Sequence, residues 1–341
     1  MKKVKLFLLI FFLNLYADVT IIGVGDVMLG TNYPSAAYLP PNDGKELLKD
    51  VNHILKDADI TFGNLEGAIL NQGPTVKKNC NKCYSFRMPE KLAENLKNAG
   101  FDVMSIANNH AADFGIRGLK NTQKVLKSLG IESAGLSTKP SVIFTKNGVK
   151  YGFAAFAPNR GTANIRDIKK AKEIVKELEE KSDIVIVSFH GGAEGANHQH
   201  ITKKTEYFYG ENRGNVYEFA HAVIDAGADV VFGHGPHVTR AIEVYKKRFI
   251  AYSLGNFCTY GRFSLQGVSG VAPIIKVKIT DDGEFISAKI IPIKQIGRGI
   301  VRIDGEKRAI KIIQQLTKTD FPELKLKIED NGFINNEEII W

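Results

Sequence analysis

The feature that most constrains the fold is a set of short apolar runs, each ending at a residue that can bind a metal ion or transfer a proton. The run Phe101–Ile106 leads into an Asn-Asn-His turn that ends at His110. Runs of this length are typical of buried strands, and open α/β sheets bind ligands at the carboxyl ends of their strands. We therefore expect one site on one sheet, because the same pattern recurs at Asp26, Glu66, His190 and His234.

Strand-like and helix-like segments alternate along the chain, which is typical of an α/β fold with helices against a sheet. The predicted strands are Val19–Val24, Ile60–Phe62, Phe101–Ile106, Lys150–Ala157, Ile184–Phe189, Asp229–Phe232 and Phe249–Leu254. The predicted helices are Lys45–Lys56, Pro89–Asn98, Leu119–Leu129, Ile168–Lys181 and Val216–Ala226.

The last part of the chain has a different pattern. Val271–Ile279 and Phe285–Ile293 alternate in polarity and are joined through Asp-Asp-Gly, which predicts an added antiparallel hairpin. A short helix is predicted at Glu306–Thr317. Because no linker is evident, we expect residues 18–300 to form one domain, with 301–341 as a helix and tail packed on it.

Length and charge limit the classes of protein that this chain can belong to. Its 341 residues are 44% hydrophobic, which is enough to bury a full core. The net charge of +9 would suit an anionic partner, but the lysines are dispersed along the chain. No nucleic-acid-binding motif occurs. We expect a basic, solvated surface that binds no nucleic acid.

The N-terminus indicates export. Three lysines in the first five residues precede the apolar run Leu6–Leu13, and Ala17 offers a small residue for cleavage before Asp18. This pattern predicts a signal peptide over residues 1–17 and a periplasmic or cell-surface protein. The run is shorter than the roughly 20 apolar residues of a membrane span. A membrane anchor is the alternative if the segment is retained.

The three cysteines favour structural rather than catalytic roles. Cys80 and Cys83 lie in a polar loop and are expected to form a local disulfide. A zinc ribbon would need a second cysteine pair, and a thioredoxin-type motif should open a helix. Cys258 follows an apolar run and is expected to be a buried free thiol.

The predicted strand ends together supply two carboxylates, one amide oxygen and three imidazoles. The most specific motif is Gly233-His234-Gly235-Pro236-His237, where one tight loop can aim both imidazoles inward. Taken alone, the Gly-Asp at Asp26 could equally be a turn or a helix cap. Oxygen and nitrogen ligands without thiolate suit one or two ions of zinc, manganese or iron. Such ions activate water and hold phosphoryl oxygens, so hydrolysis is the expected reaction.

The motifs GDVMLG, NLEG, YSFRMPE, SIANNHAADFG, SFHGGAE, GHGPHV and YSLGNF, in this order, resemble the CapA family. That family is associated with capsule and poly-gamma-glutamate synthesis and lies within the calcineurin-like metallophosphatase superfamily. The resemblance covers Val19–Phe257 and implies a four-layer αββα sandwich. It also pairs His110 with a metal-binding asparagine and implies a metal shell of Asp26, Glu66, Asn109, His190, His234 and His237.

The chain departs from the wider superfamily at three points. Met28 stands where those phosphoesterases have a histidine, and Glu66 replaces their bridging aspartate. Two residues rather than one separate His234 from His237. These departures favour one tightly bound ion and a weak or absent second one.

The predicted site residues that are not metal ligands are expected to act in catalysis or to bind substrate. His110 is expected to protonate the leaving group or to stabilise the transition state, and Asp113 to orient His110 or to cap the following helix. Arg87, Glu194 and Asn256 are expected to contact an anionic substrate. For Arg87 a surface salt bridge is the alternative, for Glu194 a contact that holds His190, and for Asn256 a turn cap.

Two functional hypotheses follow. The first is an exported metal-dependent hydrolase or transferase acting on a phosphate ester or an amide-linked anionic polymer. The second is a non-catalytic polymer-binding or export factor that uses the same site. The expected partners are the anionic polymer or phosphate-containing substrate and membrane components of a capsule synthesis or export system.

Overall fold

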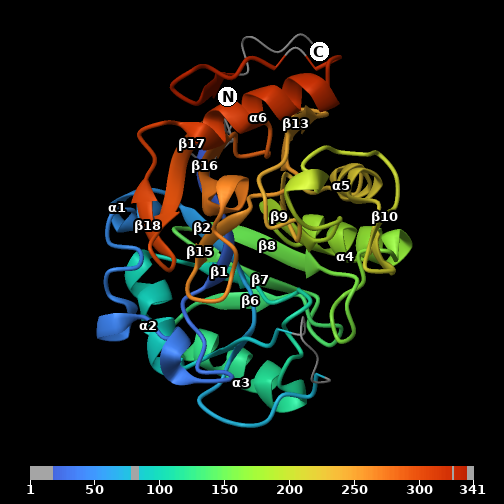
Figure 1. Cartoon of the computed structure of the whole chain (residues 1–341). Helices are drawn as coiled ribbons and strands as arrows, with labels where there is room; N and C mark the ends of the chain where they lie inside the picture. The colour runs from blue at the N-terminus through green and yellow to red at the C-terminus, as the bar shows by residue number, and fades with distance from the viewer. Residues whose placement is uncertain (1–17, 78–83, 325, 336–341) are drawn as a thin grey trace, which may run out of the picture.

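The computed structural model describes residues 18–77, 84–324 and 326–335 (Figure 1). The predicted signal peptide, the predicted disulfide between Cys80 and Cys83, and Trp341 lie outside these residues. Within the described ranges, no helix has both the length and the apolar content that crossing a membrane requires.

Two β-sheets pack face to face at the centre of the molecule. The first runs in the order β18 (Ile300–Ile303), β17 (Phe285–Ile296), β16 (Val271–Ile279), β1 (Val19–Met28), β2 (Ile60–Leu65), β5 (Val103–Ser105) and β6 (Glu132–Ala134). Two further strands join it, β15 (Asn256–Thr259) beside β1 and β19 (Phe333–Asn335) beside β17. The second sheet runs β13 (Ile242–Tyr245), β14 (Arg248–Ala251), β12 (Val230–His234), β9 (Ile184–His190), β8 (Val149–Phe156) and β7 (Ser141–Lys146).

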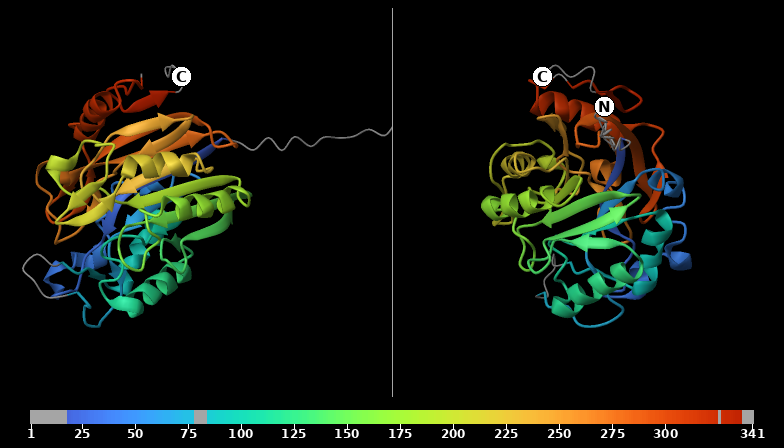
Figure 2. Two further views of the ribbon diagram at one scale, coloured as in Figure 1. Left: turned by 90° about the vertical axis from the view of Figure 1, so that its right-hand side faces the viewer. Right: turned by 180° about the vertical axis from the view of Figure 1, so that it is seen from behind.

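Helices cover the outer face of each sheet (Figures 1 and 2). The first sheet carries α1 (Asn52–Leu55), α2 (Glu90–Ala99) and α3 (Gly115–Ser128). The second carries α4 (Ile168–Glu179) and α5 (Val216–Ile224). The result is the four-layer αββα arrangement that was expected. Two small sheets lie outside these layers, β3 (Ala68–Ile69) with β4 (Arg87–Met88) and β10 (Glu206–Phe208) with β11 (Glu211–Gly214).

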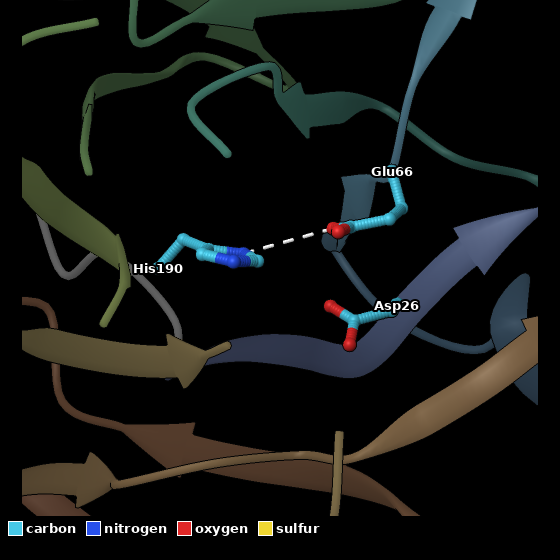
Figure 3. A group of neighbouring side chains, drawn as sticks. All are labelled: Asp26, Glu66 and His190. Atoms are coloured by element: carbon cyan, nitrogen blue, oxygen red, sulfur yellow. Dashed lines mark ion pairs between the residues drawn. The ribbon is translucent and has the colours of Figure 1, made fainter. Parts of the chain in front are cut away.

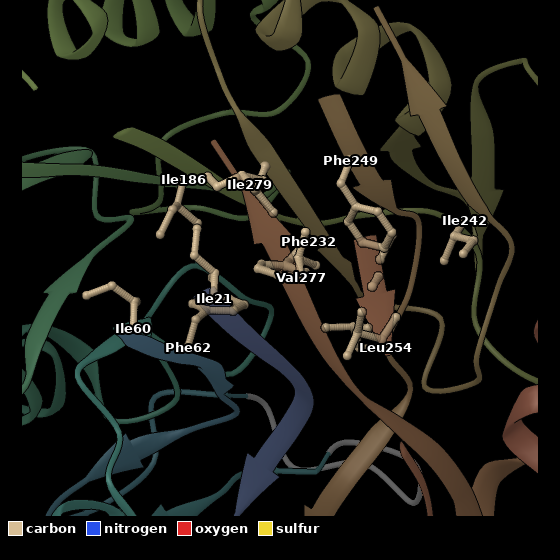
Figure 4. Close-up of a cluster of buried hydrophobic side chains, with 14 of the residues drawn as sticks. Ile21, Ile60, Phe62, Ile186, Phe232, Ile242, Phe249, Leu254, Val277 and Ile279 are labelled. Carbon is tan, nitrogen blue, oxygen red and sulfur yellow. The ribbon is translucent and has the colours of Figure 1, made fainter. Parts of the chain in front are cut away.

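The space between the two sheets is filled by aliphatic and aromatic side chains (Figure 4). Phe62 of β2 stacks on Phe232 of β12 with ring centroids 5.4 Å apart, so the two sheets meet directly. Side chains alternate across β1: Ile21 belongs to this inner core, whereas Ile22 packs under the helices. Burial of both faces explains why these strands read as near-continuous apolar runs.

The C-terminal segments extend the first sheet, as the sequence predicted. The β16–β17 hairpin pairs with β1, with Ile279 opposite Val19. Helix α6 (Arg308–Asp320) lies across the top of Figure 1 and places Ile310 and Ile313 in the inner core. Cys258 is buried and free, as expected.

One predicted helix was wrong. Of Lys45–Lys56, only Asn52–Leu55 is helical, and the preceding residues form successive turns. The carbonyl of Leu47 accepts a hydrogen bond from the Val301 amide of β18 (3.0 Å) rather than from a helical amide. Leu47 and its apolar neighbours are still buried, so tertiary contacts override the helical pattern here.

Gly25 and Gly233 each precede a predicted metal ligand and sit where two segments of backbone approach closely. A Cβ atom on Gly25 would lie 2.0 Å from the carbonyl oxygen of Gly255, and one on Gly233 would lie 2.2 Å from that of Tyr252. These glycines let the neighbouring chain come close enough for the Asp26 amide to donate to Gly255 (2.8 Å). Close approach, rather than a sharp turn, is therefore what requires glycine before Asp26.

We predict that Gly25→Ala destabilises the protein by about 2 kcal/mol or more, because its methyl group would overlap a backbone oxygen that cannot rotate away. The measurement is the free energy of unfolding by chemical denaturation. Gly305→Ala is the matched control, since no heavy atom lies within 4 Å of its added Cβ. Equal stability of the two variants would contradict the close-approach argument.

Candidate metal centre

Four of the predicted ligand residues come together where the two sheets meet at the carboxyl ends of their strands. The first sheet contributes Asp26 from within β1 and Glu66 directly after β2. The second contributes His190 and His234, the last residues of β9 and β12, which lie opposite each other in register. The expectation of a single sheet was therefore wrong, because the site spans both.

The side chains of Asp26, Glu66 and His190 point toward one another at short range (Figure 3). Asp26, Glu66 and His190 each offer a ligand atom within 4.8 Å of the others. His190 Nδ1 lies 3.6 Å from Glu66 Oε2, and His234 Nδ1 lies 3.2 Å from Asp26 Oδ1. Neither contact forms a hydrogen bond. All four side chains are buried.

His237 reaches the same cluster from the loop after β12. Its Nδ1 lies 2.8 Å from Asp26 Oδ2, and its Nε2 lies 4.0 Å from Glu66 Oε1. Its backbone has φ 57°, a left-handed conformation that is uncommon for a residue other than glycine. Strained backbone of this kind concentrates at functional sites, where the surroundings hold it in place.

Several buried polar atoms around the cluster have no hydrogen-bond partner among the described residues. They are Glu66 Oε1, Asn109 Oδ1 and both ring nitrogens of His190 and His234. An unpartnered buried polar group is costly and needs an explanation, of which a bound ion is one. The donors are carboxylate oxygen, amide oxygen and imidazole nitrogen, the set that suits zinc, manganese or iron. The residues present therefore fit a metal ion.

Burial and mutual contact shift the ionisation of these groups. Burial and the nearby Asp26 carboxylate raise the pKa of Glu66 to about 8. Burial opposes protonation of His237, but its hydrogen bond to Asp26 prevails and raises its pKa to about 10. The pKa of Asp26 is lowered, because its contacts with His234 and His237 outweigh burial. Burial lowers the pKa of His190 well below its usual value, which leaves this imidazole neutral.

His110 lies beside the cluster and is held by Asp113. His110 Nδ1 lies 2.9 Å from Asp113 Oδ2, and the Phe86 amide donates to the same oxygen (2.8 Å). Lys77 lies 3.0 Å from His110 Nδ1 and 2.5 Å from Asp113 Oδ1. Burial lowers the pKa of His110 despite the neighbouring carboxylate. The orienting contact expected for Asp113 is thus present in the structure.

A cavity of about 330 Å³ opens onto the cluster. Four further predicted site residues line this cavity together with His237. They are Asn109, His110, Glu194 and Asn256. Asn256 opens β15 rather than ending a strand, and its amide donates to the carbonyl oxygens of His237 (3.2 Å) and Ser269 (3.1 Å). Glu194 Oε1 lies 3.0 Å from Arg213 Nη1.

Arg87 is placed differently from the other predicted substrate contacts. Its Nε donates to Asn32 Oδ1 (2.6 Å), its Nη1 donates to the carbonyl of Gly73, and its guanidinium lies over the rings of Tyr33 and Phe114. It does not line the cavity. Its partners are backbone and amide groups, so the salt bridge considered as the alternative is not what holds it.

Two asparagines that sequence reasoning did not select organise the site. Asn64 Nδ2 donates to both Asp26 Oδ1 and Glu66 Oε2, each at 2.8 Å. Asn108 Nδ2 donates to Asn64 Oδ1 (3.1 Å), and Asn108 Oδ1 accepts from the His110 amide (3.1 Å). Both lie inside motifs that the sequence singled out. In the sequence, each of these asparagines stands within two residues of a predicted ligand, and this placement could have pointed to them.

We predict that the stability of the metal-free protein falls by roughly 1–3 kcal/mol as the pH rises from about 6.5 to about 8. Folding raises the pKa of Glu66 and of His237, so in this window the folded state keeps protons that the unfolded chain has released. Rising pH then favours the unfolded state. The measurement is denaturant unfolding at both pH values in the presence of a chelator.

The control for this pH dependence is Glu66→Gln, which keeps the shape of the side chain and removes its titration. We expect a flatter profile in that variant. Added zinc or manganese should oppose the trend in the unmodified protein, because metal binding displaces the same protons. Stability that rises with pH across the window would contradict the assignment.

Comparison with known proteins covers most of the chain. The family described as "Bacterial capsule synthesis protein PGA_cap" matches residues 20–260. Among solved structures, the calcineurin-like phosphoesterase YfkN from Bacillus subtilis aligns over 90% of this chain and 99% of its own, with 14% identity and a TM-score of 0.42.

Two curated relatives are similar in sequence. The capsule biosynthesis protein CapA of Bacillus anthracis is 29% identical over 69% of this chain. The PGA biosynthesis protein CapA of Bacillus subtilis (strain 168) is 31% identical over the same share. The matched stretch spans 58% and 61% of these two relatives. With its family match over residues 20–260, the chain belongs to the bacterial capsule synthesis protein family PGA_cap.

Proposed function

We propose that this chain is an exported, metal-dependent hydrolase or transferase that acts on a phosphate ester or an amide-linked anionic polymer. The observation that carries the proposal is the set of buried, unpartnered donor atoms around Asp26 and Glu66. Family membership and the names of the two relatives support a place in capsule or poly-gamma-glutamate synthesis. The basic N-terminus with its apolar run supports export to the periplasm or cell surface.

The ligands proposed for zinc, manganese or iron are Asp26, Glu66, Asn109, His190, His234 and His237. Such an ion would polarise the bond to be cleaved and activate water near neutral pH. The protein holds its ligands in place through Asn64, whose amide bridges the two carboxylates. Contacts of this kind fix the orientation of ligand side chains.

His110 is the proposed proton-transfer residue. Asp113 engages its Nδ1, which leaves Nε2 as the ring atom able to exchange a proton with a substrate in the cavity. Lys77 balances the charge of Asp113 on the same side of the ring. The Phe86 ring, 4.3 Å from the His110 ring between centroids, shields this pair from water.

A non-catalytic role in polymer binding or export is the second candidate, and one observation favours it. One large aromatic side chain remains exposed at the cavity: Tyr84 lines it and is 45% exposed. An exposed ring at a binding cavity suits contact with an extended chain or a partner protein. Membrane components of a capsule synthesis system are the proposed partners in either case.

We predict that the purified protein carries about one or two transition-metal ions per chain and that His190→Ala loses most of them. Hydrolysis of a panel of phosphomonoesters, phosphodiesters and gamma-glutamyl peptides should fall by at least about 100-fold in the same variant. Elemental mass spectrometry and product analysis measure the two effects.

His53→Ala is the matched control, since His53 is an exposed histidine of α1 away from the cavity. It should retain both metal and activity. A metal-loaded protein that is inert toward the entire panel would count against catalysis and favour the binding role. Metal retained in His190→Ala would count against the ligand assignment.

We predict that Asp113→Asn lowers kcat by roughly 10–100-fold while metal content is unchanged, because His110 loses its orienting carboxylate. The pH–rate profile should shift together with kcat. The double variant His110→Ala, Asp113→Asn should have the same kcat as His110→Ala alone, since the two residues act as a unit. Additive losses in the double variant would show that Asp113 acts independently of His110.

A further inference from the structure

We propose that Arg262 recognises the charge of the substrate: its guanidinium binds an anionic group, a carboxylate or a phosphate, that lies beside the bond held at the metal centre. This inference rests on the proposed function and names the residue that selects its substrate. The residue lines the same cavity as Asn109, His110 and His237. No motif of the sequence pointed to it.

The guanidinium of Arg262 is held in place without being neutralised. It lies over the rings of Tyr38 and Tyr84, with its central carbon 4.9 and 4.8 Å from their centroids. Its Nη1 donates a hydrogen bond to the Tyr33 carbonyl oxygen (3.4 Å). Among the described residues it has no carboxylate partner. Most of its five N–H donors therefore remain available to a ligand.

Other arginines near the site already contact carboxylates, or amide and carbonyl oxygens, of the protein. Arg213 contacts Glu194 and Glu211, and the fully buried Arg240 pairs with Glu206 at 2.7 Å. Arg87 donates hydrogen bonds to the side chain of Asn32 and to the carbonyl of Gly73. Of these cations, only Arg262 both lines the cavity and lacks a hydrogen-bonded side-chain partner in the part of the chain that the structure describes. This is the arrangement of an anion-binding residue awaiting its ligand.

The residues of the cavity wall indicate which chemical groups a ligand needs. Phe86 and Phe263 stack on each other with centroids 4.8 Å apart, and they also flank His110 (4.3 Å from Phe86) and His237 (5.5 Å from Phe263). These rings line the same cavity as Arg262 and strengthen ionic contacts by displacing water. A fitting substrate has an apolar stretch that packs on the rings and a second anionic group for Arg262.

The test is binding of three probes to the manganese-loaded, full-length protein by isothermal titration calorimetry. The probes are gamma-linked triglutamate, the same peptide with its free carboxylates converted to amides, and inorganic phosphate. We expect Arg262→Gln to weaken binding of the acidic peptide or of phosphate at least tenfold. If only the peptide binds more weakly, the group that Arg262 recognises is a carboxylate. If only phosphate binds more weakly, it is a phosphate.

Two further variants keep the result interpretable. Arg298→Gln is the matched control: Arg298 also lies over Tyr38 but does not line the cavity, and its loss should change binding less than twofold. Arg262→Lys keeps the charge without the planar fork and should bind at an intermediate level. Unchanged metal content in each variant would exclude damage to the centre.

Two results would overturn the proposal: wild-type affinity for both anions in metal-loaded Arg262→Gln, or no binding of either anion by the unmodified protein. Failure of the proposed catalytic function looks different. Binding that depends on Arg262 without turnover of any substrate would reject hydrolysis and leave the charge-recognition role supported.

Discussion

The structure depends on burying two carboxylates next to each other. Asp26 and Glu66 are both shielded from water, and each raises the cost of ionising the other. Asn64 relieves part of that cost by donating a hydrogen bond to each carboxylate, and His237 Nδ1 lies within hydrogen-bond distance of Asp26 Oδ2 (2.8 Å). The ring nitrogens of His190 and His234 have no hydrogen-bond partner among the described residues. A cation is the group that would satisfy carboxylates and imidazoles together.

The two-sheet architecture is what brings these groups together. Each sheet supplies one kind of ligand, carboxylates from β1 and β2 and imidazoles from β9 and β12, and stacking of Phe62 on Phe232 fixes the spacing between them. Neither sheet alone could surround an ion. Gly25 and Gly233 tighten the edge further, because neighbouring backbone occupies the space that a side chain would need. Stability of the core and geometry of the site are therefore coupled.

The sequence predicted the elements whose signal is local. Apolar runs ending at polar residues located β9 and β12, and the Asp-Asp-Gly turn located the β16–β17 hairpin. Features set by distant contacts were missed: the turns before Asn52 follow from pairing with β18, and the role of Asn64 follows from the approach of Asp26. Lys77 and Arg262 carry no distinctive motif, since their neighbours at the cavity come from other segments.

The described donors also bear on how many ions the centre can hold. Both oxygens of Asp26 already accept hydrogen bonds, from Asn64 and His237, whereas Glu66 Oε1, Asn109 Oδ1 and His190 have none. Met28 offers no ligand, because its sulfur accepts the Gly30 amide. A first ion would meet unpartnered atoms beside Glu66. A second ion, beside Asp26, would meet the unpartnered nitrogens of His234 but would compete with the contact between His237 and Asp26, so we expect its binding to depend more strongly on pH.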